Sequence, residues 1–176
     1  MATIRRANLA DASALASLAE RVFRDTFAAA NDPADVEIYS TKNFGLAVQA
    51  REIADPNLIT IVSEQAGELN AFAQVKVGSR IECVSAKRPT ELCRFYVAHQ
   101  WHGSGIAHEL MNEVLATVNG LSSDRLWLGV WERNDRAVRF YGKFGFAVVG
   151  DHPFVLGHDT QRDLVMALEI GAPIAA

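Results

Sequence analysis

The most constraining feature of this 176-residue chain is an apolar run that passes through a glycine-containing turn into a long amphipathic helix. Residues 91–97 have the character of a strand, and residues 104–119 repeat apolar side chains at helical spacing. The helical stripe comprises Ile106, Leu110, Met111, Val114, Leu115 and Val118. Gly120 is well placed to end this helix. The unit predicts a domain of mixed strands and helices.

The turn between strand and helix has the properties of an anion-binding site. The first backbone N–H groups of a helix lack partners within the helix, and the helix dipole adds about half a positive charge there. Gly103 and Gly105 let the backbone approach phosphate oxygens without a Cβ in the way. A dinucleotide-binding loop needs a glycine where this chain has His108, and a P-loop needs a lysine, which is absent between Lys87 and Lys143. On the two glycines alone, a connection that merely relieves backbone strain fits equally well.

The N-terminal half of the chain alternates strands and helices. In chain order, we expect a strand at 3–7, then a helix that is capped by Asp11 or Ser13 and includes Phe27, and a connection at 28–35. A helical region follows, which breaks near 43–45 and ends before Asp55. Strands at 58–63 and 69–77 should form a hairpin with its turn at 65–68, before an irregular segment at 78–89.

The C-terminal half continues in the same way. We expect a buried strand at 126–131, a helix at 135–144, strands at 146–149 and 154–156 that flank a kink at 151–153, a turn at 157–159 and a last strand at 163–170. There is no internal repeat, low-complexity tract or long linker. Residues 1–176 are therefore expected to form one domain.

The composition excludes several classes of protein. Apolar residues make up 49% of the chain and charged residues 22%, an ordinary balance for a globular domain. No run approaches the roughly 18 apolar residues of a membrane span. The N-terminus has no hydrophobic signal core, and Cys83 and Cys93 fit neither a disulfide scaffold nor a metal cluster. We expect a cytoplasmic protein with reduced thiols and no membrane partner.

The net charge and the spacing of the histidines indicate which ligands the protein is expected to bind. A net charge of −4 gives no long-range attraction for nucleic acid and suits a cationic substrate better. The sequence has no basic stripe for DNA or RNA. None of the five histidines forms a His-x-x-x-His pair or lies beside clustered cysteines, so no metal site is expected.

Two motifs connect the chain with a known family. Residues 100–105, Gln-Trp-His-Gly-Ser-Gly, resemble the Gln/Arg-x-x-Gly-x-Gly/Ala motif of the GNAT superfamily of N-acetyltransferases. Residues 134–146 resemble its second motif, Asn-x-x-Ala-x-x-Phe-Tyr-x-x-x-Gly-Phe, at every named position. The resemblance implies an α/β fold with a mixed, mostly antiparallel sheet of about seven strands and about four flanking helices. In this fold the sheet splays between two parallel strands, and acetyl-CoA enters there.

The resemblance also assigns a cofactor site for acetyl-CoA. The implied cofactor-binding residues are Phe95, Tyr96, Val97, Gln100, Trp101, His102, Gly103, Ser104, Gly105, Ile106, Ala107, Asn134, Ala137 and Phe140. The loop amides would hold the pyrophosphate, and the end of the strand would hydrogen-bond the pantetheine arm as an added strand would. Ala137 and Phe140 also suit core packing, and Asn134 suits a helix N-cap whatever the function.

The same resemblance makes Tyr141 the general acid that protonates the leaving thiolate. Its phenol is a neutral donor at pH 7, with an unperturbed pKa of about 10. A core tyrosine is the competing interpretation. We expect direct transfer without an acyl-enzyme, because Cys93 has no evident catalytic partner and burial would make it inert.

The general base is less well defined. Relatives that acetylate ribosomal-protein N-termini carry a glutamate five residues before the motif asparagine, where this chain has Gly129. This departure disfavours N-terminal peptide acetylation. Glu91, acting through water, is the remaining candidate for the base, and a solvated glutamate at a strand end is an equally good account of it.

The acceptor is suggested by a closer resemblance over residues 4–168 to the PaiA-type bacterial polyamine acetyltransferases. It is carried by residues 22–27, 127–134 and 150–157 with Gln161, Asp163 and Met166, and it implies spermidine or spermine as acceptor. By the same resemblance, the candidates for the acceptor wall are Phe27, Trp131, Glu132 and His152. The alternatives are a peptide N-terminus, an antibiotic or an amino-acid derivative as acceptor, and a module that senses acetyl-CoA without turnover. The sequence leaves a homodimer open.

Overall fold

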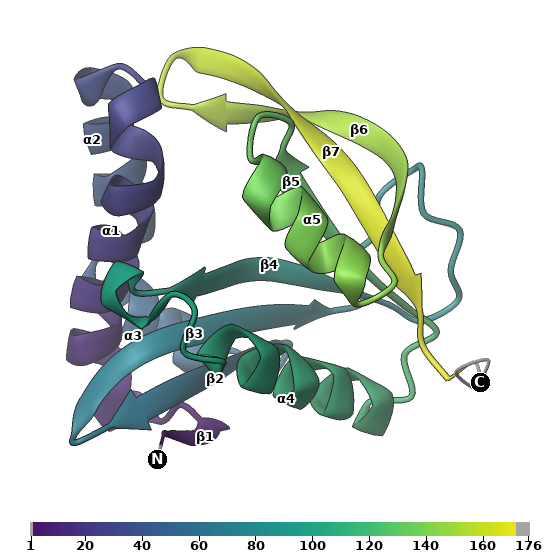
Figure 1. The fold of residues 1–176 in the computed structure, drawn as a ribbon, viewed down its shortest axis with the longest axis horizontal. Coiled ribbons are helices and arrows are strands. Elements are labelled where there is room, and N and C mark those ends of the chain that lie inside the picture. The colour runs from purple at the N-terminus through teal and green to yellow at the C-terminus, as the bar shows by residue number, and fades with distance from the viewer. Residues whose placement is uncertain (1, 172–176) are drawn as a thin grey trace.

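The computed structural model describes residues 2–171, which form one seven-stranded sheet with helices on both faces (Figure 1). In chain order the strands and α-helices are β1 (Thr3–Arg6), α1 (Ala12–Phe27), α2 (Pro33–Asn43), α3 (Leu46–Ala54), β2 (Leu58–Gln65), β3 (Glu68–Val77), β4 (Pro89–Val97), α4 (Ile106–Gly120), β5 (Arg125–Trp131), α5 (Asp135–Lys143), β6 (Ala147–Leu156) and β7 (Asp159–Glu169). The strand order in the sheet is β1-β2-β3-β4-β5-β7-β6. No helix in this part of the chain is both long and apolar enough to cross a membrane.

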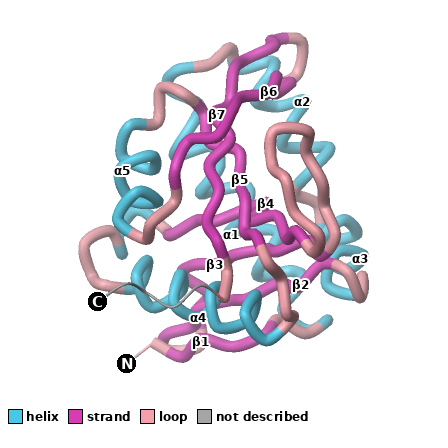
Figure 2. Tube along the Cα trace, turned by 90° about the vertical axis from the view of Figure 1, so that its right-hand side faces the viewer, coloured by secondary structure: helices cyan, strands magenta, loops and turns pink. Residues whose placement is uncertain are grey.

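The sheet splays between its two central strands. All neighbouring strands pair antiparallel except β4 and β5, which run parallel. Their pairing covers only residues 89–91 of β4 and 125–127 of β5. Beyond this point the two strands diverge, so the edge of β4 that faces β5 is free from Leu92 to Val97 (Figures 1 and 2). The predicted mixed, mostly antiparallel and splayed sheet is confirmed.

Two apolar cores hold the layers together, one on each face of the sheet. Strand side chains alternate between faces, so Ile61 of β2 joins one core and its neighbour Val62 joins the other. The core on the α4 side takes the buried stripe Ile106, Leu110, Met111, Val114 and Val118 and side chains of α5. The core on the α1 side takes Leu15, Leu18, Ala19, Val22 and Phe23. The sheet is therefore held by packed helices on both of its faces, including the part where β4 and β5 diverge.

The N-terminal helices differ from the prediction at their starts. Asn8 provides the first cap, because its side chain accepts from the Ala10 N–H and its own N–H donates to Asp11 in a capping box. Asp11 occupies the predicted N-cap position of α1, but its side chain makes no capping hydrogen bond to that helix, and Ser13 lies inside α1. Helix α2 begins at Pro33, earlier than expected, because Asp32 caps it and proline is favourable in the first turn. The break at 43–45 separates α2 from α3, which gives five α-helices within residues 2–171.

One detail nearer the C-terminus was also mispredicted. The kink expected at 151–153 is wrong, because β6 is one strand whose irregularity lies earlier, between Val148 and Gly150. Pro153 is tolerated there because β6 is an edge strand. The predicted end of α4 at Gly120 is confirmed, and the left-handed residue that follows the helix is Ser122, with φ of 56°.

Candidate active site

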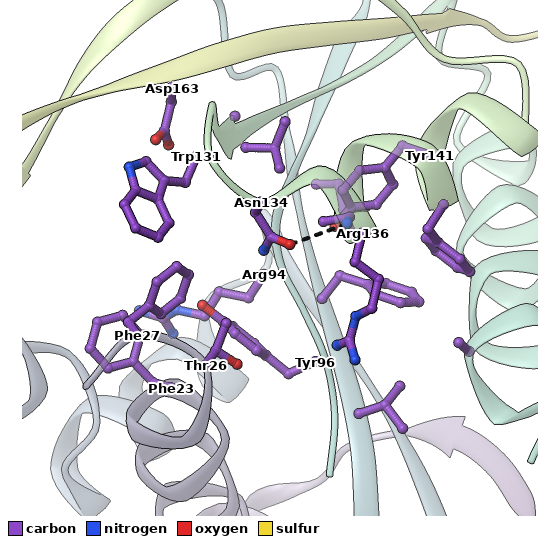
Figure 3. Close-up of a pocket in the computed structure, with 18 of the residues that line it drawn as sticks. Phe23, Thr26, Phe27, Arg94, Tyr96, Trp131, Asn134, Arg136, Tyr141 and Asp163 are labelled. Atoms are coloured by element: carbon purple, nitrogen blue, oxygen red, sulfur yellow. Dashed lines mark hydrogen bonds between the residues drawn. The ribbon is translucent and has the colours of Figure 1, made fainter. Parts of the chain in front are cut away.

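A cavity of about 490 Å³ lies where β4 and β5 diverge. Both diverging strands, the loop before α4, and helices α1, α2, α4 and α5 contribute to its wall, and β6 and β7 close one end. Figure 3 shows the cavity with Tyr141, Arg136 and Asn134 toward one side and Asp163, Trp131 and Phe27 toward the other. The site is therefore a product of the splay, which leaves the space and exposes the edge of β4.

The loop between β4 and α4 presents backbone donors. Gly103 and Gly105 have φ of 81° and 95°, a left-handed conformation that other residues rarely adopt. The N–H groups of Gly103, Gly105, Ile106 and Ala107 donate to no group in the part of the chain that the structure describes. Four unpaired donors at the positive end of a 15-residue helix fit a phosphate group.

Arg136 and His102 add further polar groups beside this loop. An Arg136 Nη1–H donates to His102 Nδ1 at 3.0 Å, so the Nε2–H of the neutral imidazole donates to the Val97 carbonyl at 2.9 Å. Desolvation lowers the pKa of His102, with the nearby Arg136 acting in the same direction, so the ring stays neutral at pH 7. The other N–H groups of the Arg136 guanidinium make no hydrogen bond to residues 2–171 and are available to an anion.

The start of α5 forms the opposite wall of the cavity. The Asn134 side chain caps α5 by accepting from the Ala137 N–H at 3.2 Å. Phe140 packs against Phe95 of β4, with ring centroids 5.4 Å apart, and spans the gap between the diverging elements. An apolar passage thus runs from the loop along the free edge of β4.

Tyr141 lies deeper in the same wall. Its ring packs against Phe95, Phe140 and Phe146, and the side chain is buried although it lines the cavity. Burial raises the pKa of the phenol. No group within residues 2–171 hydrogen-bonds its hydroxyl. The hydroxyl is therefore a protonated donor with no competing partner among the residues that the structure describes.

The other end of the cavity is aromatic and holds one buried carboxylate. Phe27 lies 6.0 Å from the Trp131 ring, and Tyr39 packs against both Phe23 and Phe154. Asp163 of β7 lines this end, and burial raises the pKa of its carboxyl to about 6. Aromatic faces and a carboxylate together suit an organic cation.

A second cavity, of about 830 Å³, adjoins this end and shares Trp131 and Gln161 with the first. Its lining is mostly polar. The charged groups there are Asp32, Asp35, Glu132, Asp151 and Asp159 against Arg133 and Arg162. Arg162 is held by Glu132 at 3.1 Å and by Asp151 at 2.7 Å. The three remaining aspartates leave the second cavity acidic.

Comparison with known proteins shows to which family the chain belongs. Residues 16–146 match the acetyltransferase (GNAT) family. The chain belongs to this family. An uncharacterized N-acetyltransferase of Mycobacterium bovis is 33% identical over 162 residues, which cover 92% of this chain and 99% of that protein.

Solved structures of the family agree with the fold. The PaiA N-acetyltransferase of Thermoplasma acidophilum in complex with coenzyme A has a TM-score of 0.79 at 19% identity, covering 96% of this chain and 99% of that one. YncA of Salmonella typhimurium with acetyl-CoA has a TM-score of 0.69 at 20% identity, covering 100% and 98%. The predictions of a GNAT fold and of an acetyl-CoA-dependent N-acetyltransferase are confirmed at the level of the family.

Most residues predicted to bind acetyl-CoA line the cavity of this GNAT domain. They are Phe95, Tyr96, Val97, Trp101, His102, Gly103, Gly105, Ala107, Asn134, Ala137 and Phe140. Gln100 is exposed outside the cavity lining, the Ser104 hydroxyl donates to the Trp101 carbonyl, and the Ile106 side chain is buried in the core. For Ile106 the backbone N–H, and not the side chain, is the group that faces the loop.

The structure places Glu91 and Cys93 differently from the prediction. Glu91 lies where β4 and β5 are still paired, outside the cavity lining, and accepts a hydrogen bond of 2.5 Å from the Ser79 hydroxyl. Cys93 is exposed and lines the cavity, so the expected burial is wrong. Desolvation by the surrounding wall still raises the pKa of its thiol to about 12, which makes it a poor nucleophile.

Sequence reasoning missed Arg136 and Asp163 as site residues. Arg136 occupies an unspecified position of the second motif, and only its place in the first turn of α5 brings it to the loop. Of the acceptor-wall candidates, Phe27 and Trp131 line the first cavity, and Trp131, Glu132 and His152 line the second. No three His, Cys, Asp or Glu side chains within 2–171 are grouped to hold a metal ion.

Proposed function

We propose that this GNAT enzyme acetylates a primary amine of a polyamine such as spermidine or spermine, with Tyr141 as general acid. The observation that supports the proposal is that the aromatic cavity and the acidic one adjoin, since Trp131 and Gln161 line both. A polyamine has several ammonium groups on an apolar chain. One ammonium then lies at the aromatic end beside Asp163, and the others extend toward Asp32, Asp35 and Asp159.

The donor site fits coenzyme A in three respects. The unpaired N–H groups of the loop suit its diphosphate, and the free edge of β4 offers backbone groups to the amides of the pantetheine arm. The gap between β4 and α5 leads past Phe140 to Tyr141. When bound there, acetyl-CoA supplies an electrophilic thioester.

The protein's own groups then move protons. Tyr141 holds a proton that its raised pKa keeps in place at neutral pH, and its hydroxyl is free to donate to a leaving sulfur. The aromatic wall excludes water from the amine and strengthens its attraction to the single carboxylate. A second structure of similar fold with a different named acceptor, the ribosomal-protein-S18-alanine N-acetyltransferase of Escherichia coli, makes a peptide N-terminus the alternative to test.

A thiol-release assay over a panel of amines tests the proposal. The panel contains spermidine, spermine, a monoamine of equal length and a tetrapeptide with a free N-terminus. We expect kcat/KM for spermidine to exceed that for the monoamine at least tenfold, since the extra ammonium groups reach the second cavity. We also expect Tyr141→Phe to lower the rate of the chemical step roughly 10²-fold or more with unchanged affinity for acetyl-CoA.

Three outcomes contradict parts of this proposal. A preference for the tetrapeptide contradicts a polyamine as the acceptor. If no amine in the panel causes thiol release although acetyl-CoA binds tightly, the protein is a sensor of acetyl-CoA and not an enzyme. A Tyr141→Phe variant with the wild-type rate of the chemical step contradicts the role of the phenol.

A further inference from the structure

Asp163 occupies the centre of a row of three residues that crosses β5, β7 and β6. In the register of the sheet it lies opposite Trp131 of β5 and opposite His152 of β6. The residue is 8% exposed and lines the first cavity. Figure 3 shows its carboxylate directed toward the Trp131 side chain and the cavity.

The carboxylate has few partners in the protein. Its Oδ1 atom is buried and has no hydrogen-bond partner within the described range 2–171. No ion pair joins it to His152, although an electrostatic effect of that side chain lowers the pKa of the carboxyl. A buried carboxylate without a hydrogen bond destabilises the folded state. Such a group in the wall of a cavity indicates a functional role, because a ligand can provide what the protein does not.

Gly129 makes room for this arrangement. A Cβ at Gly129 would lie 2.7 Å from His152 Nε2 and 3.3 Å from Asp163 Oδ2, so any side chain there would displace them. The two polar groups therefore converge on one point above the β5 backbone. From this point β5 continues through Val130 and Trp131 along the same cavity that Tyr141 lines.

We propose that Asp163 is the general base that takes a proton from the acceptor ammonium, an inference that rests on the proposed amine acetyltransferase function. An ammonium of pKa about 10.4 is neutral in only about one molecule in a few thousand at pH 7, so transfer needs such a base. Asp163 lies on the acceptor side of the cavity, whereas Glu91 lies outside it. The phenol of Tyr141 lies on the donor side, so acid and base approach the reacting atoms from two sides.

The proton and electron balance closes with these two residues. The ammonium loses one proton to the Asp163 carboxylate, and its freed electron pair forms the C–N bond with the acetyl carbon. The C–S bond breaks, and the sulfur takes the proton of the Tyr141 phenol. The second proton lost from nitrogen restores that phenol, and Asp163 releases its proton to solvent.

The surroundings of Asp163 support a base that works near neutral pH. The titratable groups that face it are His152 from β6, Tyr39 from α2 and Tyr96 from β4, and Arg94 of β4 lines the same cavity. Arg94 is paired with Glu52 at 2.6 Å, which limits its effect on the carboxylate. Desolvation is the largest influence, and it raises the pKa of Asp163 to about 6.

The pH dependence of kcat/KM for an acceptor amine tests the inference. For the wild type we expect a plateau between about pH 6, the pKa of Asp163, and about pH 10, the pKa of the amine. For Asp163→Asn only the neutral amine reacts. Its kcat/KM should be roughly 10²-fold or more lower at pH 7, rise about tenfold per pH unit, and approach the wild type near pH 10. Asp163→Glu should recover part of the loss at pH 7.

The control is Glu169→Gln, which changes a carboxylate to an amide on the same strand but at an exposed pair with Arg125. It should keep the wild-type profile. Acetyl-CoA affinity is measured for every variant to confirm that the donor site is intact. A deficit of Asp163→Asn that is equal at all pH values would mean that Asp163 only anchors the ammonium, and this would overturn the inference.

The wild-type profile provides an independent test even if Asp163→Asn folds poorly. A wild-type kcat/KM that rises tenfold per unit from pH 6 to 9, without a plateau, also overturns the role of Asp163. Failure of the proposed function is distinguishable from both results, because the wild type would then release no thiol with any amine in the panel.

Discussion

At the residue scale, burial acts on two acid groups of the cavity with opposite consequences. It raises the pKa of Tyr141, which keeps the phenol protonated and able to donate. It raises the pKa of Asp163 to about 6, which is close to neutral pH, so the carboxylate can accept a proton there. Environments that hold a donor and an acceptor in one cavity are the usual basis for assigning acid and base.

These two residues also show the reach of sequence reasoning. Tyr141 was predicted because it lies in a contiguous motif whose residues share one helix. Asp163 was not predicted as a site residue, because its place depends on the register of β7 against both β5 and β6. Its closeness to Gly129 follows from pairing between distant segments, which local spacing does not reveal.

The pKa of Asp163 predicts how folding stability depends on pH. The carboxyl has an ordinary value of 3.8 and about 6 in the folded protein, so the folded state holds its proton more tightly. The wild type therefore loses stability relative to Asp163→Asn as the pH rises from about 4 to about 6. Above about pH 6 the loss reaches its full size, up to about 3 kcal/mol. Urea unfolding near pH 4 and near pH 8 measures the difference. If the stability difference between Asp163→Asn and the wild type is the same at both pH values, the raised pKa of Asp163 is contradicted. The control, Glu169→Gln, should change stability little at either pH.

At the element scale, the strand–turn–helix unit of β4 and α4 was predictable because its signals are local. The glycines, the apolar strand and the helical stripe all lie within one contiguous segment. The kink expected in β6 failed for the opposite reason. Proline there is compatible with a strand at the edge of the sheet, and the position of β6 at the edge is a property of the whole sheet.

The turn before α4 gives a prediction with a matched control. Gly105 has φ of 95° and Gly67, in the β2–β3 turn, has φ of 81°, and a Cβ at either would meet no atom within 4 Å. Replacement of either glycine by alanine should therefore destabilise the fold similarly, by about 1 kcal/mol. Only Gly105→Ala should weaken acetyl-CoA binding, at least tenfold, because it shifts the amides of the loop. Calorimetric titration and thermal unfolding of both variants measure this, and equal affinity in the two variants contradicts the assignment of the loop.

At the scale of the whole molecule, the two halves of the sheet line different ends of the cavity, and we propose that each end receives one of the two substrates. β1 to β4 carry the loop and the free strand edge, whereas β5 to β7 carry Trp131, Gln161 and Asp163. Helix α5 follows β5 and places Tyr141 at the divergence. The resemblance of two motifs was sufficient to predict this splayed architecture, but the acidic second cavity depends on segments around residues 31 and 160 that only the folded chain brings together.

The most direct test of the account is a crystal structure of the protein with coenzyme A. We expect the diphosphate on the N–H groups of Gly103, Gly105 and Ala107, the pantetheine arm along the free edge of β4, and the sulfur within hydrogen-bonding distance of the Tyr141 hydroxyl. Coenzyme A bound away from the divergence of β4 and β5, or a sulfur that lies outside the reach of Tyr141, would contradict it.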